Sequence, residues 1–317
     1  MRTIYLAAGC FWGAEAYFRR LPGIIEVEVG YANGLEEKTN YQKLKYTGHA
    51  ETVKLVYDEN QIKTAEVLDR YYRIIDPTSI NRQGNDCGTQ YRTGIYYQRT
   101  DQASEKIIAE SLALLQEEIS EPLAIEFQTL KNYVRAEDYH QDYLTKNPQG
   151  YCHINPNKAF DVLYLPNYTE EELADLKKRL SRDEFKVTQE QGTEAPHSSP
   201  YNAVTEAGIY VDVVTGQPLF SSDDKYDAGC GWPSFTMPIT TDVISYTDDY
   251  RFNMLRTEVS ASYADTHLGH VFSDGPEDRG GQRYCINGIS LRFIPVLRMR
   301  EFGYAKLLPY IENKEIL

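Results

Sequence analysis

The chain has 317 residues, with 33 basic and 47 acidic side chains and a net charge of −14. This length is typical of about two domains, and a hydrophobic content of 41% is enough to form cores. A charge of this sign repels phosphate backbones and anionic lipid, so we expect neither nucleic acid nor a membrane as a partner. No run approaches the roughly 18 apolar residues of a membrane span. The apolar run at residues 4–10 is short for a secretory signal, so we expect a cytoplasmic protein.

The first half of the chain mixes strand and helix signals. Residues 4–8 form a short apolar strand candidate, and a helical stretch with Phe11, Ala14 and Phe18 follows. Asp76-Pro77 is a helix stop. Further strands are predicted at residues 53–57 and 95–97, and further helices at residues 67–75 and 107–115. Strands that alternate with helices indicate a layered α/β or α+β domain over residues 1–160.

Residues 161–181 form a predicted linker with one short helix. Thr169 and Glu172 are spaced as a capping box, and three leucines follow at helical spacing. Residues 189–201 are rich in Gly, Pro, Ser and Thr and predict a surface loop. Strand signals dominate beyond that loop, so we expect a mainly β domain over residues 182–317. Its predicted strands are residues 209–214, 243–246, 258–263 and 289–296.

The five cysteines are dispersed along the chain. They are Cys10, Cys87, Cys152, Cys230 and Cys285. The closest two are 285 − 230 = 55 residues apart, so no Cys-x-x-Cys motif for a zinc ribbon or a thioredoxin-type redox pair exists. In a cytoplasmic chain, such cysteines favour transient, catalytic disulfides over a structural framework.

Cys10 lies between a predicted strand and the start of a predicted helix. Backbone N–H groups and the positive end of the helix dipole favour thiolate over thiol at such a position, so Cys10 is a candidate nucleophile. The alternative is a buried, inert cysteine, and position alone leaves both interpretations open.

The motifs around Cys10 resemble those of the A-type methionine sulfoxide reductases over residues 1–160. The motifs are Gly9-Cys10-Phe11-Trp12-Gly13, Gly48-His49-Ala50-Glu51, Gly84-Asn85-Asp86, Gln90-Tyr91-Arg92 and Glu137-Asp138-Tyr139-His140-Gln141-Asp142-Tyr143-Leu144. The resemblance implies a cysteine enzyme that reduces methionine sulfoxide. We expect its fold to be an α+β layered domain of the ferredoxin-like plait type.

The resemblance also implies a role for each pocket residue. Cys10 would attack the sulfoxide sulfur, while Phe11 and Trp12 would hold the substrate methyl group. Glu51 would protonate the sulfoxide oxygen, which leaves poorly until it is protonated; a carboxylic acid kept neutral in a partly apolar pocket can supply that proton. The residues that would bind the oxygen or shape the pocket are Tyr41, Asp86 and Tyr91. Without the motif, a surface charge or core packing would explain Glu51 or Tyr91.

Attack by Cys10 would leave a sulfenic acid, which condenses with a nearby thiol. By resemblance, Cys152 lies where a C-terminal resolving cysteine is found in this family. Cys87 departs from the family pattern, because a basic residue commonly follows Asn-Asp there. Its neighbour Asp86 matches a pocket residue, so Cys87 is a competing candidate for the resolving thiol.

Three later motifs resemble those of the B-type methionine sulfoxide reductases over residues 182–310. They are Gly229-Cys230-Gly231-Trp232-Pro233-Ser234-Phe235, His267-Leu268-Gly269-His270-Val271-Phe272 and Arg283-Tyr284-Cys285-Ile286-Asn287. The resemblance implies that Cys285 is the nucleophile and Cys230 the resolving thiol. The other implied pocket residues are His267, His270 and Asn287 on the polar side, Arg283 in support, and Trp232 as the wall for the methyl group. Histidine suits an acid role near neutral pH. A core or metal role for the two histidines is the alternative, although no third ligand is evident.

The second domain departs from the B-type pattern at one point. Many members of that family bind a structural zinc through two Cys-x-x-Cys pairs. The corresponding positions here are Asp212, Thr215, Ala261 and Ala264. A tetrahedral thiolate site cannot form from these residues, so we expect a zinc-free domain with no bound metal.

Taken together, the two resemblances imply a fused enzyme that repairs oxidised methionine. The first domain would reduce the S epimer of methionine sulfoxide and the second the R epimer. Each cycle would end in an intramolecular disulfide that thioredoxin or dithiothreitol reduces. We expect no bound cofactor and a monomeric chain.

Two other functions remain as alternatives. A thiol hydrolase would use Cys285, His270 and Asn287 as a Cys-His-Asn set, and turnover of an ester or amide would support it. A redox sensor would only oxidise its cysteines, and stoichiometric disulfide formation without repeated turnover would support that reading.

Overall fold

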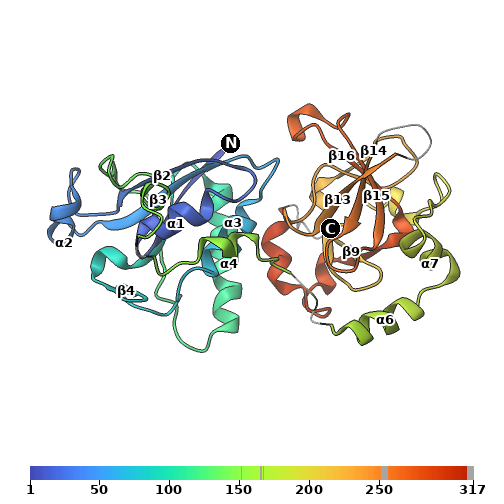
Figure 1. The fold of residues 1–317 in the computed structure, drawn as a ribbon, viewed down its shortest axis with the longest axis horizontal. Helices are drawn as coiled ribbons and strands as arrows, with labels where there is room; N and C mark the ends of the chain where they lie inside the picture. The colour runs from blue at the N-terminus through green and yellow to red at the C-terminus, as the bar shows by residue number, and fades with distance from the viewer. Residues whose placement is uncertain (151, 165, 167, 251–255, 313–317) are drawn as a thin grey trace. The chain divides into compact units, whose positions relative to one another are not determined.

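The computed structural model describes residues 1–150, 152–164, 166, 168–250 and 256–312. The chain divides into two compact units, Met1–Asp161 and Val162–Leu317. The first unit has a mixed sheet with helices and the second is mostly strands, as predicted (Figure 1). Among the described residues, no helix is both long enough and apolar enough to span a membrane.

The first unit is built on a six-stranded sheet in the order β7-β6-β1-β3-β2-β8. Its strands are β1 (Arg2–Ala8), β2 (Ile24–Ala32), β3 (Ala50–Tyr57), β6 (Thr93–Tyr97), β7 (Glu126–Thr129) and β8 (Tyr133–Arg135). Only β6 and β7 pair in parallel. A separate hairpin consists of β4 (Arg82–Gln83) and β5 (Asp86–Cys87). The strands predicted at residues 4–8, 53–57 and 95–97 are confirmed within β1, β3 and β6.

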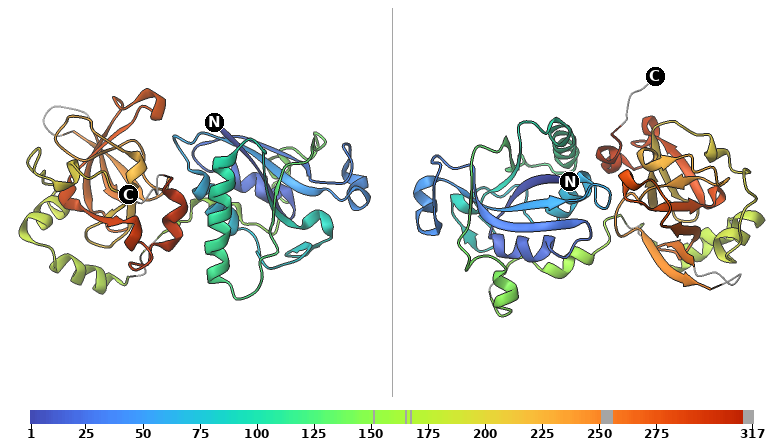
Figure 2. Two further views of the ribbon diagram at one scale, coloured as in Figure 1. Left: turned by 180° about the vertical axis from the view of Figure 1, so that it is seen from behind. Right: turned by 90° about the horizontal axis from the view of Figure 1, so that it is seen from above.

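Helices lie between the strands of this sheet and after its last strand. They are α1 (Phe11–Phe18), α2 (Leu44–Thr47), α3 (Thr64–Tyr72), α4 (Gln102–Glu118) and α5 (Tyr143–Lys146). The helix predicted over residues 67–75 begins earlier and ends at Tyr72. The helix predicted over residues 107–115 is longer, because Asp101 caps α4 by accepting the Ser104 backbone N–H at 3.0 Å. Figure 2 shows α4 from behind, beside the sheet of its own unit.

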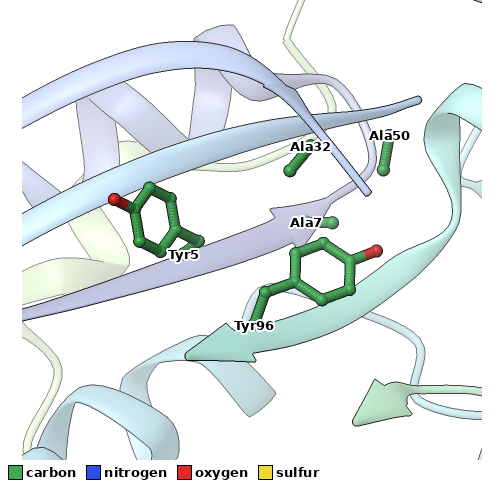
Figure 3. Packing of buried hydrophobic residues seen from close by; sticks show 5 residues of the cluster. All are labelled: Tyr5, Ala7, Ala32, Ala50 and Tyr96. Carbon is green, nitrogen blue, oxygen red and sulfur yellow. The ribbon is translucent and has the colours of Figure 1, made fainter. Parts of the chain in front are cut away.

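Alternation along β1 and β3 gives the sheet two buried faces. Ile4 and Leu6 of β1 pair with Leu55 and Val53 of β3, and all four are buried on one face. Glu51 lies on that same face of β3. The opposite face holds a cluster of small and aromatic side chains (Figure 3), namely Tyr5, Ala7, Ala32, Ala50 and Tyr96. A buried carboxyl group near the start of β3, a central strand of the sheet, is thus the feature that packing does not explain.

The second unit contains two antiparallel sheets, in the orders β11-β12-β16-β15-β14-β13 and β10-β9-β17. The strands of the larger sheet are β11 (Lys225–Tyr226), β12 (Ser234–Phe235), β13 (Ile244–Asp249), β14 (Arg256–Ala261), β15 (His267–Phe272) and β16 (Arg283–Ile286). Those of the smaller sheet are β9 (Gly208–Asp212), β10 (Pro218–Ser221) and β17 (Leu291–Pro295). All four predicted strands are found, with ends shifted by a few residues.

Two helices precede these sheets. α6 (Glu170–Lys178) begins at the predicted capping box, in which Thr169 and Glu172 bond reciprocally. α7 (Arg182–Gln189) was not predicted, although Ser181 and Glu184 form a second capping box that carries the same sequence signal. The loop predicted over residues 189–201 begins where α7 ends.

Candidate active sites

Cys10 lies where β1 turns into α1. Gly9 makes the turn with φ +80°, and a Cβ there would come within 2.5 Å of the Gln83 Cβ, so this position requires glycine. Cys10 is the N-cap residue of α1, and its side chain is 8% exposed. The short, sharp connection places a nearly buried thiol at the end of the first unit's sheet.

The electrostatic surroundings hold Cys10 as a thiol. Burial raises the pKa of Cys10 well above its usual value, and the neighbouring Glu51 raises it further. The backbone N–H of Trp12 lowers this pKa by hydrogen bonding, but it does not offset burial. The expectation that the helix start favours the thiolate is therefore wrong for the resting protein, because desolvation outweighs the helix terminus.

Glu51 is the acid of this site. Its side chain is 1% exposed, and Oε2 accepts the Phe11 backbone N–H at 3.2 Å. Burial raises the pKa of Glu51 to about 8, although the hydrogen bond from Phe11 opposes the rise. At neutral pH the side chain is therefore mostly a neutral carboxylic acid that can donate a proton.

Aromatic rings surround the mouth of the site. Trp12 stacks on Tyr143 with ring centroids 3.7 Å apart, and its Nε1–H donates to His140 Nδ1 at 3.2 Å. Phe11 meets the same His140 edge-on at 5.2 Å, and Tyr41 lies 4.8 Å from it. These contacts fix Phe11 and Trp12 as rigid apolar surfaces next to Cys10.

Tyr41, Tyr91 and Asp86 complete this site. Burial raises the pKa of both tyrosines, and Glu51 raises each of them further, so both hydroxyls lie near its carboxyl group. Asp86, on β5, raises the pKa of Glu51 and of Cys10 in turn. The structure thus brings together all the residues that the A-type resemblance assigned to the pocket.

Cys152 packs against the helix that carries Cys10. A Cβ on Gly13 would come within 2.5 Å of Cys152 Sγ, and Gly13 lies one helical turn beyond Cys10 on the same face. Cys152 also contributes to the raised pKa of Cys10. Cys87 is exposed, and its Sγ lies 3.7 Å from the Asn85 carbonyl oxygen of its own hairpin. The described contacts bring Cys152, and not Cys87, onto α1.

The second site is a row of side chains across the larger sheet of the second unit. Cys285 on β16 lies opposite Ser234 on one side and His270 on the other. Residues opposite each other in an antiparallel sheet point to the same face. Cys230 reaches this row from the loop before β12, with its Sγ 3.5 Å from Cys285 Sγ and 3.3 Å from Ser234 Oγ.

The two thiols of this site are coupled. Burial raises the pKa of Cys285 to about 12, the proximity of Cys230 adds to the rise, and Arg283 opposes it. The pKa of Cys230 is lowered, because hydrogen bonds from Ser234 and its other neighbours outweigh the effect of burial. The pair therefore loses a first proton far more readily than a second, and Arg283 favours that single negative charge. Arg283 itself is held by Asp274 through contacts of 2.8 and 2.9 Å.

A register shift turns both histidines to the face of Cys285. Ser260 on β14 pairs with His267 instead of Leu268, so β15 carries one extra residue between His267 and His270. The two imidazole rings lie 5.9 Å apart. In a regular strand, residues three apart would point to opposite faces, so the bulge creates this side of the site.

Buried carboxylates hold the two histidines, and the sequence did not reveal them. His267 Nδ1 lies 2.6 Å from Glu258 Oε1, and His270 Nε2 lies 2.9 Å from Asp249 Oδ2. Arg256 donates to Asp249 Oδ2 at 2.6 Å. Such partners fix the ring orientation and the nitrogen that carries the proton. Only the strand register shows that Glu258 lies directly opposite His270.

Asn287 and Trp232 meet at one loop residue. Asn287 accepts the Glu194 backbone N–H at 3.0 Å and donates to the Leu268 carbonyl oxygen at 3.0 Å, while Trp232 Nε1–H donates to the Glu194 carbonyl oxygen at 3.2 Å. Both polar ends of the Asn287 amide therefore hold backbone. The hydrolase alternative needs Asn287 to orient His270, but the partner of His270 is Asp249.

Hydrogen bonds occupy the corner at Asp212 and Thr215, two of the positions where the B-type resemblance implied zinc ligands. Asp212 is fully buried, and its carboxylate accepts the Val214 and Thr215 backbone N–H groups at 3.1 Å and the Thr215 hydroxyl at 2.6 Å. Thr266 donates to the same carboxylate at 3.2 Å, which ties the two turns together. Within the described part of the chain, no three His, Cys, Asp or Glu side chains are arranged for a metal. These residues do not fit a zinc ion, because one carboxylate is the only charged group.

Comparison with known proteins identifies both halves of the chain. Residues 2–172 match the family model for peptide methionine sulfoxide reductase, and residues 180–295 match that for the SelR domain. Methionine sulfoxide reductase A of Corynebacterium diphtheriae is 36% identical over 48% of this chain and 77% of its own, with a TM-score of 0.44. Mxr1 from Saccharomyces cerevisiae in its reduced form is 38% identical over 48% of this chain and 88% of its own, with a TM-score of 0.45.

Two thiol sites on two separate units define a bifunctional oxidoreductase. The chain belongs to the peptide methionine sulfoxide reductase family. With its SelR domain, it is an A-type methionine sulfoxide reductase fused to a B-type one, and methionine sulfoxide is its substrate.

Proposed function

We propose that the first domain reduces the S epimer and the second domain the R epimer of methionine sulfoxide, each through its own pair of cysteines. One observation carries the proposal: each unit holds a nucleophile candidate beside a proton donor and a second thiol. Cys10 lies with Glu51 and Cys152, and Cys285 lies with His270 and Cys230.

In the first domain, Cys10 attacks the sulfoxide sulfur while Glu51 protonates the oxygen. A bond forms between the two sulfur atoms as the S–O bond breaks, and the oxygen leaves as water with the proton of Glu51 and the thiol proton of Cys10. A water molecule then attacks the Cys10 sulfur, the S–S bond breaks with its electron pair going to the methionine sulfur, and methionine leaves as Cys10 becomes a sulfenic acid. The proton that this water releases restores Glu51. A resting state with both groups protonated suits this exchange, because the step needs no proton from solvent.

The pocket residues bind the two ends of the sulfoxide. Phe11 and Trp12 hold the methyl group against rigid aromatic faces. Tyr41 and Tyr91 donate hydrogen bonds to the sulfoxide oxygen, and the raised pKa of each keeps its hydroxyl protonated. Asp86 shapes the polar side of the pocket.

The sulfenic acid is resolved within each domain. Cys152 condenses with oxidised Cys10, releases water and leaves a disulfide. Cys230 does the same for Cys285, and the gap of 3.5 Å between their sulfur atoms needs to close by only about 1.5 Å to reach a disulfide bond. Thioredoxin, or dithiothreitol in its place, then reduces each disulfide by thiol exchange.

In the second domain, a histidine supplies the proton that Glu51 supplies in the first. His270 lies beside Cys285 in the sheet, His267 lies behind it, and Arg283 stabilises the attacking thiolate. Trp232 is the apolar wall for the substrate methyl group. Asn287 acts by holding the loop behind Trp232 in place.

The remaining properties follow from the same function. We infer a cytoplasmic monomer without zinc or another cofactor, which repairs oxidised methionine in proteins or as the free amino acid. The first domain's core, with helices between β1 and β2 and between β3 and β6, supports the ferredoxin-like plait that we expect.

Turnover of the separated epimers tests the proposal. With dithiothreitol as reductant, Cys10→Ser should abolish reduction of the S epimer and leave the R epimer nearly unaffected, and Cys285→Ser should do the reverse. Cys87→Ser is the matched control and should retain both activities. Loss of both activities in one folded single variant would contradict two independent sites.

A further inference from the structure

Residues 152–154, here called the strap, lie across the start of α1. Cys152 Sγ and the Ile154 side chain fill the space above Gly13, where a Cβ would come within 2.5 Å and 3.0 Å of them. The strap is not free to turn, because Ile154 is 4% exposed. The missing side chain of Gly13 therefore leaves the space on α1 in which the segment that carries Cys152 packs.

His153 fixes the strap to the substrate pocket. Its Nδ1 lies 3.3 Å from Asp86 Oδ2, and the two side chains are 13% and 19% exposed. Its side chain also packs against Gly9 and Gly84, where an added Cβ would lie 3.3 Å from the ring and 3.2 Å from the His153 Cβ, respectively. Two successive side chains thus fix the strap: Cys152 contacts α1, and His153 contacts Asp86.

The other end of this segment is anchored independently. Arg70 is 1% exposed, and its guanidinium donates to the Ala159 and Asp161 carbonyl oxygens at 3.3 and 2.6 Å. Glu66 lies 3.1 Å from the same guanidinium. The chain beyond the strap is therefore held on α3, and the strap itself is held by the packing of Ile154 on α1 and by the contact between His153 and Asp86.

We propose that His153 is a positioning residue for the resolving step: its contact with Asp86 holds Cys152 beside Cys10 and sets the rate of disulfide formation. The inference rests on the proposed role of Cys152. In the step, the Cys152 sulfur bonds to the Cys10 sulfur, the S–O bond of the sulfenic acid breaks, and the hydroxyl group leaves with the thiol proton as water. His153 forms and breaks no bond in this step and transfers no proton.

Position is the role that the geometry supports for His153. The Cys152 Sγ–H donates to the Ile154 carbonyl oxygen at 2.8 Å and not to the imidazole. Burial lowers the pKa of His153, although Asp86 opposes this, so the ring is largely neutral at neutral pH and its Nδ1 remains in contact with Asp86 Oδ2 at 3.3 Å. An asparagine could make the same contact with its amide nitrogen, but it could not act as a base.

The experiment uses the full chain with Cys285→Ser, so that only the first domain reacts. Reduced protein is mixed with one equivalent of the S epimer without reductant, and the reaction is quenched over time. Methionine formation reports attack by Cys10, and peptide mapping after alkylation reports the Cys10–Cys152 linkage. The variants are His153→Ala, His153→Asn and, as a control on an exposed residue of the same segment, Lys158→Ala.

We expect His153→Ala to form methionine at the parent rate but to form the disulfide about tenfold more slowly, so that sulfenic acid accumulates. His153→Asn should restore most of the rate, and Lys158→Ala should match the parent. An unchanged disulfide rate in His153→Ala would overturn the proposal and leave the function of Cys152 intact. Failure of His153→Asn to restore the rate would also overturn it. Absence of a Cys10–Cys152 linkage in the parent would instead remove the resolving role on which the proposal rests.

Discussion

Raising the pH from 7 to 9 should switch off the first domain, because its acid must be protonated to act. Burial raises the pKa of Glu51 to about 8. The protonated fraction then falls from about nine-tenths at pH 7 to about one-tenth at pH 9, which predicts a loss of about tenfold in rate. Cys10 does not offset this loss, since its own pKa is raised further still and its thiol stays protonated across this range.

The assay is single-turnover reduction of the S epimer by the Cys285→Ser chain between pH 6 and pH 10. The rate should be level at low pH, reach half near pH 8 and fall tenfold for each further unit. Glu51→Gln should be slow and insensitive to pH over the same range. A rate that rises from pH 7 to pH 9 would refute the reasoning, because it would mean that ionisation of Cys10, and not protonation of the sulfoxide, limits attack.

Five further predictions concern stability, disulfide formation and metal content. In the folded protein Glu51 keeps a proton that it loses above pH 4.5 in the unfolded chain. The free energy of unfolding should therefore decrease as the pH rises from about 4.5 to 8, and the decrease should reach about 3 kcal/mol at pH 7. Urea unfolding at pH 5 and pH 7 should show this decrease in the parent and not in Glu51→Gln. An equal decrease in the variant would contradict the assignment of the effect to Glu51. Gly13→Ala should displace Cys152 and slow disulfide formation without slowing methionine release, as measured by quenched mapping. Cys230→Ser should give one methionine per chain from the R epimer but no thioredoxin-supported turnover. Asp212→Ala should destabilise the second domain by about 2–4 kcal/mol in urea unfolding, because four buried donors lose their acceptor. Elemental analysis should find no stoichiometric zinc, whereas one zinc per chain would contradict the zinc-free account.

Local signals predicted much of the fold. The apolar run before Cys10 gave β1 and the start of α1, and the capping box at Thr169 gave α6. The same type of box at Ser181 marks α7, which could have been predicted because the signal lies within four residues. Strand ends were less accurate. β9 stops at Asp212 because that side chain bonds the following turn, a choice that periodicity does not show.

The sites needed more than local sequence. Family motifs pointed to Cys10, Glu51 and Cys285, and the structure places each beside its expected neighbours. The carboxylate partners Asp249 and Glu258 were missed, because they lie 21 and 9 residues from their histidines and meet them only through strand pairing. The direction of the shift in the Cys10 pKa also depends on how deeply the thiol is buried. A position at the start of a helix does not determine that burial.

The most direct test of the central claim, that each domain completes its own thiol cycle, is a count of products and linkages in one reaction. Fully reduced chain is mixed with excess sulfoxide of both epimers and no reductant, and methionine and disulfides are measured together. Two independent cycles predict two methionines per chain, the linkages Cys10–Cys152 and Cys230–Cys285, and Cys87 left free. One methionine per chain, or a Cys10–Cys87 linkage with Cys152 free, would contradict the account.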